Sequence, residues 1–473
     1  MKIAFVAAAL LLLFKLLMLG VIGPVHSADA PSYSNFADAM IASSRWLHDA
    51  DLTSHAFPIT TFRIVGYPTI IAAAKLLTGS EWPYAVVGLQ LAVSTGVFLA
   101  VFCLGVNLGL TRVWAVAGAL VYATSLQLSL DQCLMSDSVN ASMIILAVII
   151  FLRGADGERI HQWQIVTSGF LLAAAFLTRE ILPYLMIALM PLLVIRCTFV
   201  TVIPRFARFV PCLLVCLPLV AAYQGYELWN WHRTGERFVT TTAQINALLP
   251  VAYAAKNGPA MFTGDSPLDR HAAPILKHYT FEEAVGINDA LFRDGYVATE
   301  ISHMALEKYA TAWRQYPGAM LNLIRIATSE HLAKLAIRPI TSVCEVFEWS
   351  DRPTCFDYRD LYRKLFHQPT DMRIGEVAVF IVITIQNALS IGISALFFAG
   401  IPILLVMSWR SGTLGSDRPL AVAAGFWMLV VGWHLISAEV IYTDRYMMPV
   451  IPFLIIGGLL AANSFKRRRL ARP

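Results

Sequence analysis

Charged residues are scarce in this chain. They make up 14% of its 473 residues, whereas an ordinary soluble domain carries roughly 25%. Hydrophobic residues make up 57%. This balance excludes a water-soluble globular protein, and the high hydrophobicity also excludes an intrinsically disordered chain. A protein with many membrane-spanning segments remains.

Cysteine is also sparse, and the short motifs of several protein classes are missing. Seven cysteines are too few for a disulfide scaffold, and glycine shows no collagen-like period. The sequence contains no zinc-type Cys/His spacing, phosphate-binding glycine loop or nucleophile elbow. Internal repeats are not evident, which weakens the hypothesis of a transporter built from inverted repeats. The net charge of +5 lies mainly at the ends of apolar runs, so it indicates topology and not a nucleic-acid partner.

Long apolar runs occupy both ends of the chain. A spanning helix needs about 20 mostly apolar residues. Ten runs are candidates: 3–23, 84–107, 113–130, 138–152, 163–179, 181–197, 209–228, 380–408, 418–438 and 447–464. We interpret the weakly apolar stretch 66–78 as a re-entrant or interfacial segment. The predicted fold class is an all-α polytopic membrane protein with about 10–12 spans.

The basic residues of the short loops predict the orientation of these spans. Cytoplasmic loops carry an excess of Lys and Arg, so the C-terminal run 466–469 is expected inside the cell. The opposite face then carries an outer loop, 25–64, and a polar stretch, 229–375, that holds about half of all acidic residues. Apolar positions in this stretch recur every three or four residues, which predicts a mainly helical outer domain.

Three regions follow from this reading. Residues 1–228 form an N-terminal transmembrane module, residues 229–375 a periplasmic domain, and residues 376–473 the C-terminal spans with a basic cytoplasmic tail. The first 30 residues have an alternative interpretation as a cleaved secretory signal with a small-residue site at 28–30. Lys15 interrupts the apolar run, which is unusual for a signal core.

Two cysteines, Cys344 and Cys355, fall in the outer domain. In an oxidising compartment they are candidates for a local disulfide, and the alternative is a pair of thiols.

Charged residues close to the spans cluster on the predicted outer side. A charge at the centre of a bilayer costs about 2.5–3.5 kcal/mol, so such residues usually face a cavity or mark a functional site. The group comprises Asp29, Asp38, Arg63, Asp131, Asp137, Arg179, Glu180, Asp444 and Arg445. Simpler readings are also open: Arg179 and Glu180 as the polar hinge of a helical hairpin, and Asp137 as a helix cap. His303 is read as part of an ordinary face of an outer-domain helix.

Two short motifs in the first outer loop carry a family resemblance. Asp29 precedes Tyr33 by four residues, and the stretch 63–68 reads Arg-Ile-Val-Gly-Tyr-Pro. Further matching positions follow in order: Gln90, Met135–Asp137, Leu177–Arg179, Gly235, Phe238–Thr241, Arg445, Tyr446, Pro449 and Pro452. Their order resembles the GT-C superfamily of membrane glycosyltransferases, specifically relatives of dolichyl-phosphate-mannose-protein mannosyltransferase and aminoarabinose transferase. Val65 departs from the proline usual in the Arg-x-Pro-Gly-Tyr-Pro turn.

The resemblance implies a GT-C-like helical bundle that transfers a sugar, with inversion, from a polyprenyl-phosphate carrier to an acceptor hydroxyl on the outer face. Asp29 is then the expected general base. The residues expected to bind carrier phosphate, sugar or acceptor are Tyr33, Arg63, Tyr67, Asp137, Arg179, Glu180, Arg445 and Tyr446. Whether arginine acts alone or with a divalent metal ion, held by Asp29 and Asp137, stays open at this point.

The implied partners are the lipid-linked sugar donor, an acceptor that is a glycan, a lipid or a protein, and membrane lipids, with no nucleic acid. The implied location is a bacterial inner membrane, with the large loop periplasmic and the C-terminus cytoplasmic. Two alternatives remain. One is a transporter or flippase for a lipid-linked glycan, which needs no general base. The other is a glycan polymerase or ligase that uses a pyrophosphate-linked oligosaccharide.

Overall fold

A computed structural model describes most of the chain. The described residues are 2–43, 52–154, 161–180, 210–256, 258–332, 342, 346, 374–412, 418–440 and 444–470. The predicted span 181–197 and the candidate disulfide between Cys344 and Cys355 lie outside these residues, so both stay predictions.

The regular secondary structure in the N-terminal part of the described chain is helical. Its helices are α1 (Lys2–Ile22), α2 (Ala30–Ala42), α3 (Ile59–Phe62), α4 (Gly66–Thr78), α5 (Trp82–Asn107), α6 (Arg112–Ala123), α7 (Leu126–Gln132), α8 (Asp137–Gly154), α9 (Gln162–Thr178) and α11 (Val210–Thr234). A 3-10 turn, Gly79–Glu81, joins α4 to α5. The predicted span 113–130 is broken: α6 and α7 meet at an angle of 49°.

Within the described residues, six helices follow in the region predicted to form the outer domain, which we call the outer helices, and four come after it. The outer helices are α12 (Ala243–Asn246), α13 (Leu248–Lys256), α14 (Pro267–Ile275), α15 (Phe281–Arg293), α16 (Ala298–Gln315) and α17 (Pro317–Leu332). The C-terminal helices are α20 (Ile374–Ala395), α21 (Ile401–Arg410), α22 (Arg418–Val440) and α23 (Ile451–Leu470). A π turn, Leu396–Gly400, joins α20 to α21, and a 3-10 segment, Asp444–Val450, precedes α23.

Seven helical segments within the described residues are long and apolar enough to cross a membrane. They are Lys2–Ile22, Gly66–Asn107, Asp137–Gly154, Val210–Thr234, Glu376–Arg410, Pro419–Ser437 and Arg445–Arg468. The bent α6–α7 pair adds an eighth if it counts as one span, and α9 is a shorter apolar helix. The described residues form no β-strand, so the prediction of an all-α polytopic membrane protein is confirmed.

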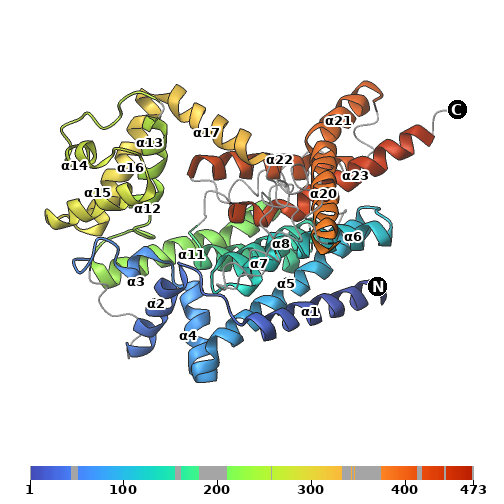
Figure 1. Cartoon of the computed structure of the whole chain (residues 1–473), viewed down its shortest axis with the longest axis horizontal. Helices are drawn as coiled ribbons and strands as arrows, with labels where there is room; N and C mark the ends of the chain where they lie inside the picture. Colours follow the sequence, from blue (N-terminus) through green and yellow to red (C-terminus); the bar gives the residue numbers. More distant parts are fainter. Residues whose placement is uncertain are drawn as a thin grey trace.

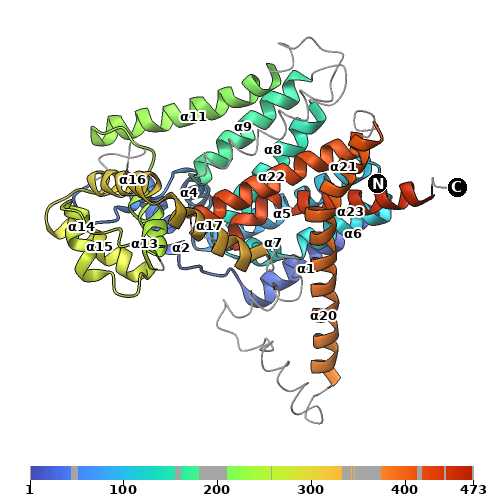
Figure 2. The ribbon, with the colours of Figure 1, turned by 90° about the horizontal axis from the view of Figure 1, so that it is seen from above.

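The outer helices sit at one end of the molecule and both termini at the other. Figures 1 and 2 show α12–α16 grouped on the left, while the N- and C-terminal ends lie on the right. Helices α13–α16 have an apolar core of their own, which includes Ile287, Leu291, Ile301 and Ala305. The helical spacing predicted around residue 300 is therefore confirmed in α16.

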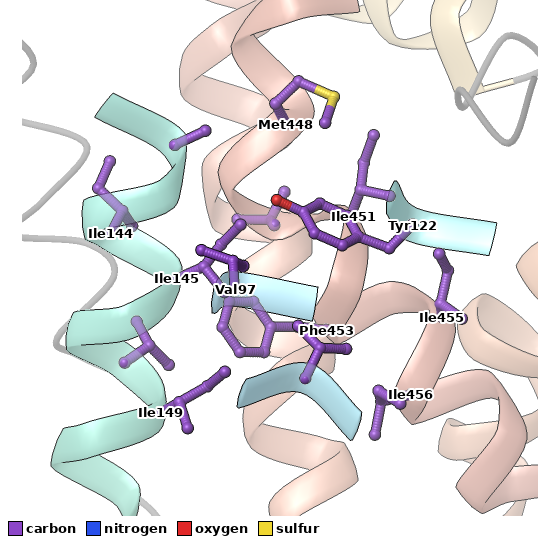
Figure 3. Close-up of a cluster of buried hydrophobic side chains, with 14 of the residues drawn as sticks. Val97, Tyr122, Ile144, Ile145, Ile149, Met448, Ile451, Phe453, Ile455 and Ile456 are labelled. Atoms are coloured by element: carbon purple, nitrogen blue, oxygen red, sulfur yellow. The ribbon is translucent and has the colours of Figure 1, made fainter. Parts of the chain in front are cut away.

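The spans pack on a second, larger apolar core. Figure 3 shows side chains of α5, α6, α8 and α23 meeting in it, including Val97, Tyr122, Ile145 and Phe453. Each of these four side chains is fully buried. Because α23 and the segment before it pack against α6 and α8, the C-terminal quarter of the chain helps to hold the N-terminal module.

A buried ion pair anchors α1 to this core. Lys15 Nζ lies 2.6 Å from Asp131 Oδ2 of α7, and both side chains are fully buried. The expectation that Asp131 reaches the outer face is therefore wrong: its partner is a lysine inside the first span. This packing of α1 favours a retained span over the secretory-signal alternative.

Helix α4 corresponds to the stretch read as re-entrant or interfacial. Figure 1 shows it running steeply across the direction of α1. It packs against α2, and Lys75 near its end pairs with the exposed Asp38 at 2.6 Å. Because α4 also forms part of the candidate span Gly66–Asn107, the interfacial reading of 66–78 stays a prediction.

Candidate active site

A cavity of about 860 Å³ lies where the outer helices meet the ends of the spans. The chain segments after α1, α3 and α9, the 3-10 segment before α23, and helices α8 and α11 line one side. Helices α13 and α16 and the segment 237–243 line the other side. Of the nine predicted site residues, eight line this cavity: Asp29, Tyr33, Arg63, Asp137, Arg179, Glu180, Arg445 and Tyr446.

Asp29 lies in the turn between α1 and α2, and its carboxylate accepts hydrogen bonds from two arginines. Arg63 Nη2 donates to Asp29 Oδ1 at 2.6 Å, and Arg445 Nη1 donates to Asp29 Oδ2 at 3.2 Å. Arg63 is further fixed by a bond from its Nε to Ser32 Oγ and by the Tyr33 ring, 4.8 Å from its guanidinium carbon. The carboxylate is partly open to the cavity, because a quarter of its side chain stays exposed.

A second pair lies beside the first. Asp137, at the start of α8, is almost fully buried and forms an ion pair with Arg179, the residue after the end of α9. The Arg179 guanidinium carbon lies 4.6 Å from the centre of the Tyr446 ring. Arg445 Nε approaches Asp137 Oδ1 at 4.0 Å. Arg445 therefore contacts both carboxylates and links the two pairs.

The cluster of Asp29, Arg63, Asp137, Arg179 and Arg445 carries one uncompensated positive charge. Its arginine side chains are 15–28% exposed, so they combine partial desolvation with access to the cavity. Glu180, Glu227 and Arg237 also line the cavity and balance the total lining charge, so the positive excess is local to the cluster. Partly buried arginines with spare donors are suited to bind a phosphate or a carboxylate.

The electrostatic surroundings keep these groups ionised. Burial by itself would raise the pKa of the Asp29 carboxyl, but the positive charges of Arg63 and Arg445 hold that pKa below its usual range. Burial acts to lower the pKa of Arg63, and the neighbouring Tyr33 and Asp29 outweigh it and hold the pKa above the usual value. At neutral pH the pair is therefore carboxylate and guanidinium.

Tyr67 is the one predicted site residue that does not line the cavity. It is fully buried, and its hydroxyl donates to Gln90 Oε1 at 2.8 Å. Its ring meets the Tyr33 ring edge-on, with centroids 5.0 Å apart. Tyr67 therefore packs behind Tyr33 and supports its ring. The sequence instead predicts that Tyr67 contacts the substrate.

Sequence reasoning missed the wall of the cavity formed by the outer domain. Thr299, Ser302, His303 and Leu306 line it from α16, although His303 was read as an ordinary helix face. These positions follow the three- and four-residue spacing of one helix face. A polar stripe at that spacing, next to the buried Ile301 and Ala305, is the signal that could have identified this wall.

The site does not fit a metal ion that is bound by protein side chains alone. Within the described residues, no group of three or more His, Cys, Asp or Glu side chains comes together as metal ligands. The two candidate ligands, Asp29 and Asp137, already face arginines at ion-pair distance. Zn²⁺ sites use three or four such ligands, whereas Mg²⁺ uses one or two carboxylates together with substrate phosphates. These contacts therefore argue against a zinc-type site and do not bear on Mg²⁺ bound together with a substrate phosphate.

Comparisons with known proteins give a weak likeness. No protein-family model matches the chain, and no curated protein matches it. Among solved structures, ArnT from Cupriavidus metallidurans bound to undecaprenyl phosphate is similar, with 13% identity and a TM-score of 0.34, over 97% of this chain and 77% of that one. Its apo state gives 12% identity and a TM-score of 0.33, over 96% and 77%. Similarity at this level carries no conclusion about the reaction of this chain.

Proposed function

We propose that this protein is an inverting glycosyltransferase that moves a sugar from a polyprenyl-phosphate carrier to an acceptor hydroxyl. The observation that carries the proposal is the pair of arginines on Asp29, at a cavity that opens beside the ends of membrane spans. The ordered motifs that resemble the GT-C superfamily support the same reaction. We further place the protein in a bacterial inner membrane, with the outer domain periplasmic and the C-terminus cytoplasmic.

The arginines have two roles in this scheme. In the resting site they neutralise Asp29 and Asp137. A carrier phosphate competes for the same guanidinium groups, because arginine binds phosphate through paired donors. When Arg63 and Arg445 turn toward the phosphate, Asp29 loses its compensating charges, so its proton affinity rises. Binding of the donor thereby converts a well-stabilised carboxylate into a stronger base.

Transfer then follows in one displacement. The acceptor oxygen attacks the anomeric carbon from the face opposite the phosphate, and Asp29 takes the hydroxyl proton. The bond between the anomeric carbon and the phosphate oxygen breaks as the new glycosidic bond forms. The bonding electrons leave with the phosphate, whose developing negative charge is stabilised by Arg63, Arg179 and Arg445. The products are the glycosylated acceptor, inverted at the anomeric carbon, and the free polyprenyl phosphate.

Asp29→Asn tests the base assignment. The change keeps the shape of the side chain and removes its proton affinity, so we expect the transfer rate to fall by about 10²–10⁴-fold. The measurement is mass spectrometry of envelope glycans and carrier lipids from cells that carry the wild type, the variant or a deletion. Polyprenyl-phosphate-sugar should accumulate, and one glycan modification should disappear, in both the variant and the deletion.

Asp38→Asn is the matched control. Asp38 is an exposed carboxylate of α2, paired with Lys75, and it does not line the cavity, so transfer should stay at the wild-type rate. Wild-type transfer in Asp29→Asn would overturn the assignment of the base. Movement of lipid-linked sugar between leaflets, with no transfer by the wild type, would favour the flippase alternative.

A further inference from the structure

A charged cluster is buried among the spans, away from the cavity. Lys15 of α1 donates to Asp131 Oδ2 at 2.6 Å and to Ser94 Oγ of α5 at 2.9 Å. Ser94 Oγ also donates to Asp131 Oδ2 at 2.6 Å. Gln127 Nε2 and Ser138 Oγ each donate to Asp131 Oδ1 at 2.5 Å. All five residues are fully buried, and none of them is among the residues that line the cavity.

This cluster is not built to react. Both oxygens of Asp131 accept two bonds each, so the carboxylate has no open side for a substrate. Stability alone is also a weak reason for it, because a well-packed apolar pair of similar volume is often at least as stable as a buried ion pair. The best attested use of a buried polar pair is to fix the register between helices.

The register of the first span is poorly fixed without a polar contact. Helix α1 is apolar, and Lys15 is the one Lys, Arg, Asp or Glu between Lys2 and Asp29. Apolar contacts to its neighbours tolerate sliding and rotation more readily than a charged contact does. The paired charges select one axial position of α1 against α7.

Each member of this pair is followed in the sequence by a carboxylate of the site: Lys15 by Asp29, and Asp131 by Asp137. The two connecting segments are hydrogen-bonded to each other. The backbone N–H of Val25 donates to Gln132 O, and that of Leu134 donates to Val25 O, each at 2.9 Å. Ser27 Oγ donates to Leu134 O at 3.1 Å. Beyond these bonds, Tyr33 OH and Ser136 Oγ lie 3.0 Å apart. We name these linked segments, 25–33 and 132–136, the strap. Asp29 lies within its first segment, and Asp137 directly follows its second.

We propose that Lys15 and Asp131 are positioning residues for the transfer reaction, which set the register of α1 against α7 and, through the strap, hold Asp29 opposite Asp137 and the arginines. This inference rests on the proposed function. The pair acts from inside the membrane on a reaction at its boundary, without touching the substrate.

The test replaces both charges together. Lys15→Met with Asp131→Leu removes the pair without leaving one charge unpaired. With the donor supplied as a carrier-lipid extract from the same cells, we expect kcat to fall tenfold or more while KM for the donor stays within twofold. Hydrogen exchange of peptides that cover 23–30 and 131–137 should become at least tenfold faster, because the strap bonds open. Expression level and thermal midpoint should stay close to those of the wild type.

The matched control is a largely buried ion pair of the outer domain, Lys308 with Asp269, whose Nζ and Oδ1 atoms lie 2.5 Å apart. Lys308→Met with Asp269→Leu should leave kcat and strap exchange unchanged. If the folded Lys15→Met/Asp131→Leu variant keeps wild-type kcat and wild-type strap exchange, the positioning role is wrong. If the wild type itself transfers no sugar, the proposed function fails instead. Exchange then decides the positioning role alone: faster strap exchange supports it, and unchanged exchange overturns it.

A second variant covers the case in which the double replacement does not accumulate. Asp131→Glu keeps the paired charges and lengthens one arm by a methylene, so it shifts the register without removing the compensation. A fall in kcat with faster strap exchange supports the inference. Wild-type values of both overturn it.

Discussion

At the scale of the residue, Asp29 combines two roles that ask for different environments. The two arginines keep its carboxylate ionised, which suits a base that must start deprotonated. The same arginines weaken it as a proton acceptor, because they stabilise the charged form. The structure therefore fits a base that becomes effective only after a competing anion has drawn the arginines away.

Arg63→Gln is expected to move the acid limb of the pH profile. Activity needs ionised Asp29, so log kcat/KM falls as pH drops through the pKa of this group in the free enzyme. Arg63 holds that pKa below its usual range. Without Arg63 the pKa rises, so the acid limb should appear at higher pH than in the wild type.

Lys75→Gln provides the comparison for this profile. It also removes a cation beside an aspartate, but Lys75 pairs with Asp38 outside the cavity lining. Its acid limb should coincide with that of the wild type. If the acid limb of Arg63→Gln lies at the same pH as that of the wild type, or at lower pH, the assignment of Asp29 as the titrating base is wrong.

At the scale of the element, the start of α4 and the end of α9 approach unusually closely. A Cβ atom placed on Gly66 would lie 2.4 Å from Leu177 O and 2.9 Å from Thr178 N. Both are backbone atoms, which cannot give way as a flexible side chain can. Arg63 lies three residues before Gly66, and Arg179 directly follows Thr178. The close approach at Gly66 therefore sets the distance between the two segments that carry these arginines.

Gly66→Ala should therefore impair catalysis. The methyl group forces the two backbone segments apart and should lower kcat/KM by tenfold or more, with a loss of roughly 1–3 kcal/mol in stability from overpacking. Steady-state kinetics and thermal unfolding in detergent measure the two effects. Gly88→Ala in α5 is the control, because no atom lies within 4 Å of its added Cβ. Equal kinetics for the two variants would refute the role of the close contact.

The sequence predicts most of the helices, because the signals that mark a helix lie within the helix itself. Bilayer length and helical periodicity are properties of 10–25 consecutive residues or so, so α1, α5, α8 and α22 could be located without knowledge of their neighbours. The partner of Lys15 could not be found in this way. Asp131 is 116 positions away, and hydropathy records both residues only as interruptions of apolar runs.

The site could be predicted in part for a similar reason. Counting spans brings Asp29, Arg63, Asp137, Arg179 and Arg445 to one face, and the structure brings these five together. The role of Tyr67 as a support and the α16 wall depend on side-chain packing between distant helices. Neither follows from topology alone.

At the scale of the whole molecule, the charge distribution predicts which side each end occupies. The outer domain and the basic C-terminal run lie at opposite ends of the helical bundle (Figures 1 and 2). Gly295 is exposed in the turn between α15 and α16. A protease site inserted after it should be cleaved in sealed spheroplasts. A tag on the C-terminus should stay intact until the cells are lysed.

A protease site after Gly412 is the control for this experiment. Gly412 is exposed after α21 and is separated by two predicted spans, 418–438 and 447–464, from the C-terminal run expected in the cytoplasm. The loop is therefore expected on the same side, and the site should be protected in sealed cells. Cleavage after Gly412 with protection after Gly295 would reverse the proposed orientation.

The ion pair of Lys15 and Asp131 also bears on how the chain is made. The two residues are 116 positions apart, and synthesis at about 5–20 residues per second separates their emergence by roughly 6–23 s. During that interval α1 enters the bilayer with a lysine whose partner does not yet exist. The first span is thus committed to its final place only when α7 arrives. Arg445 comes later still, so the reaction centre is completed close to the end of translation.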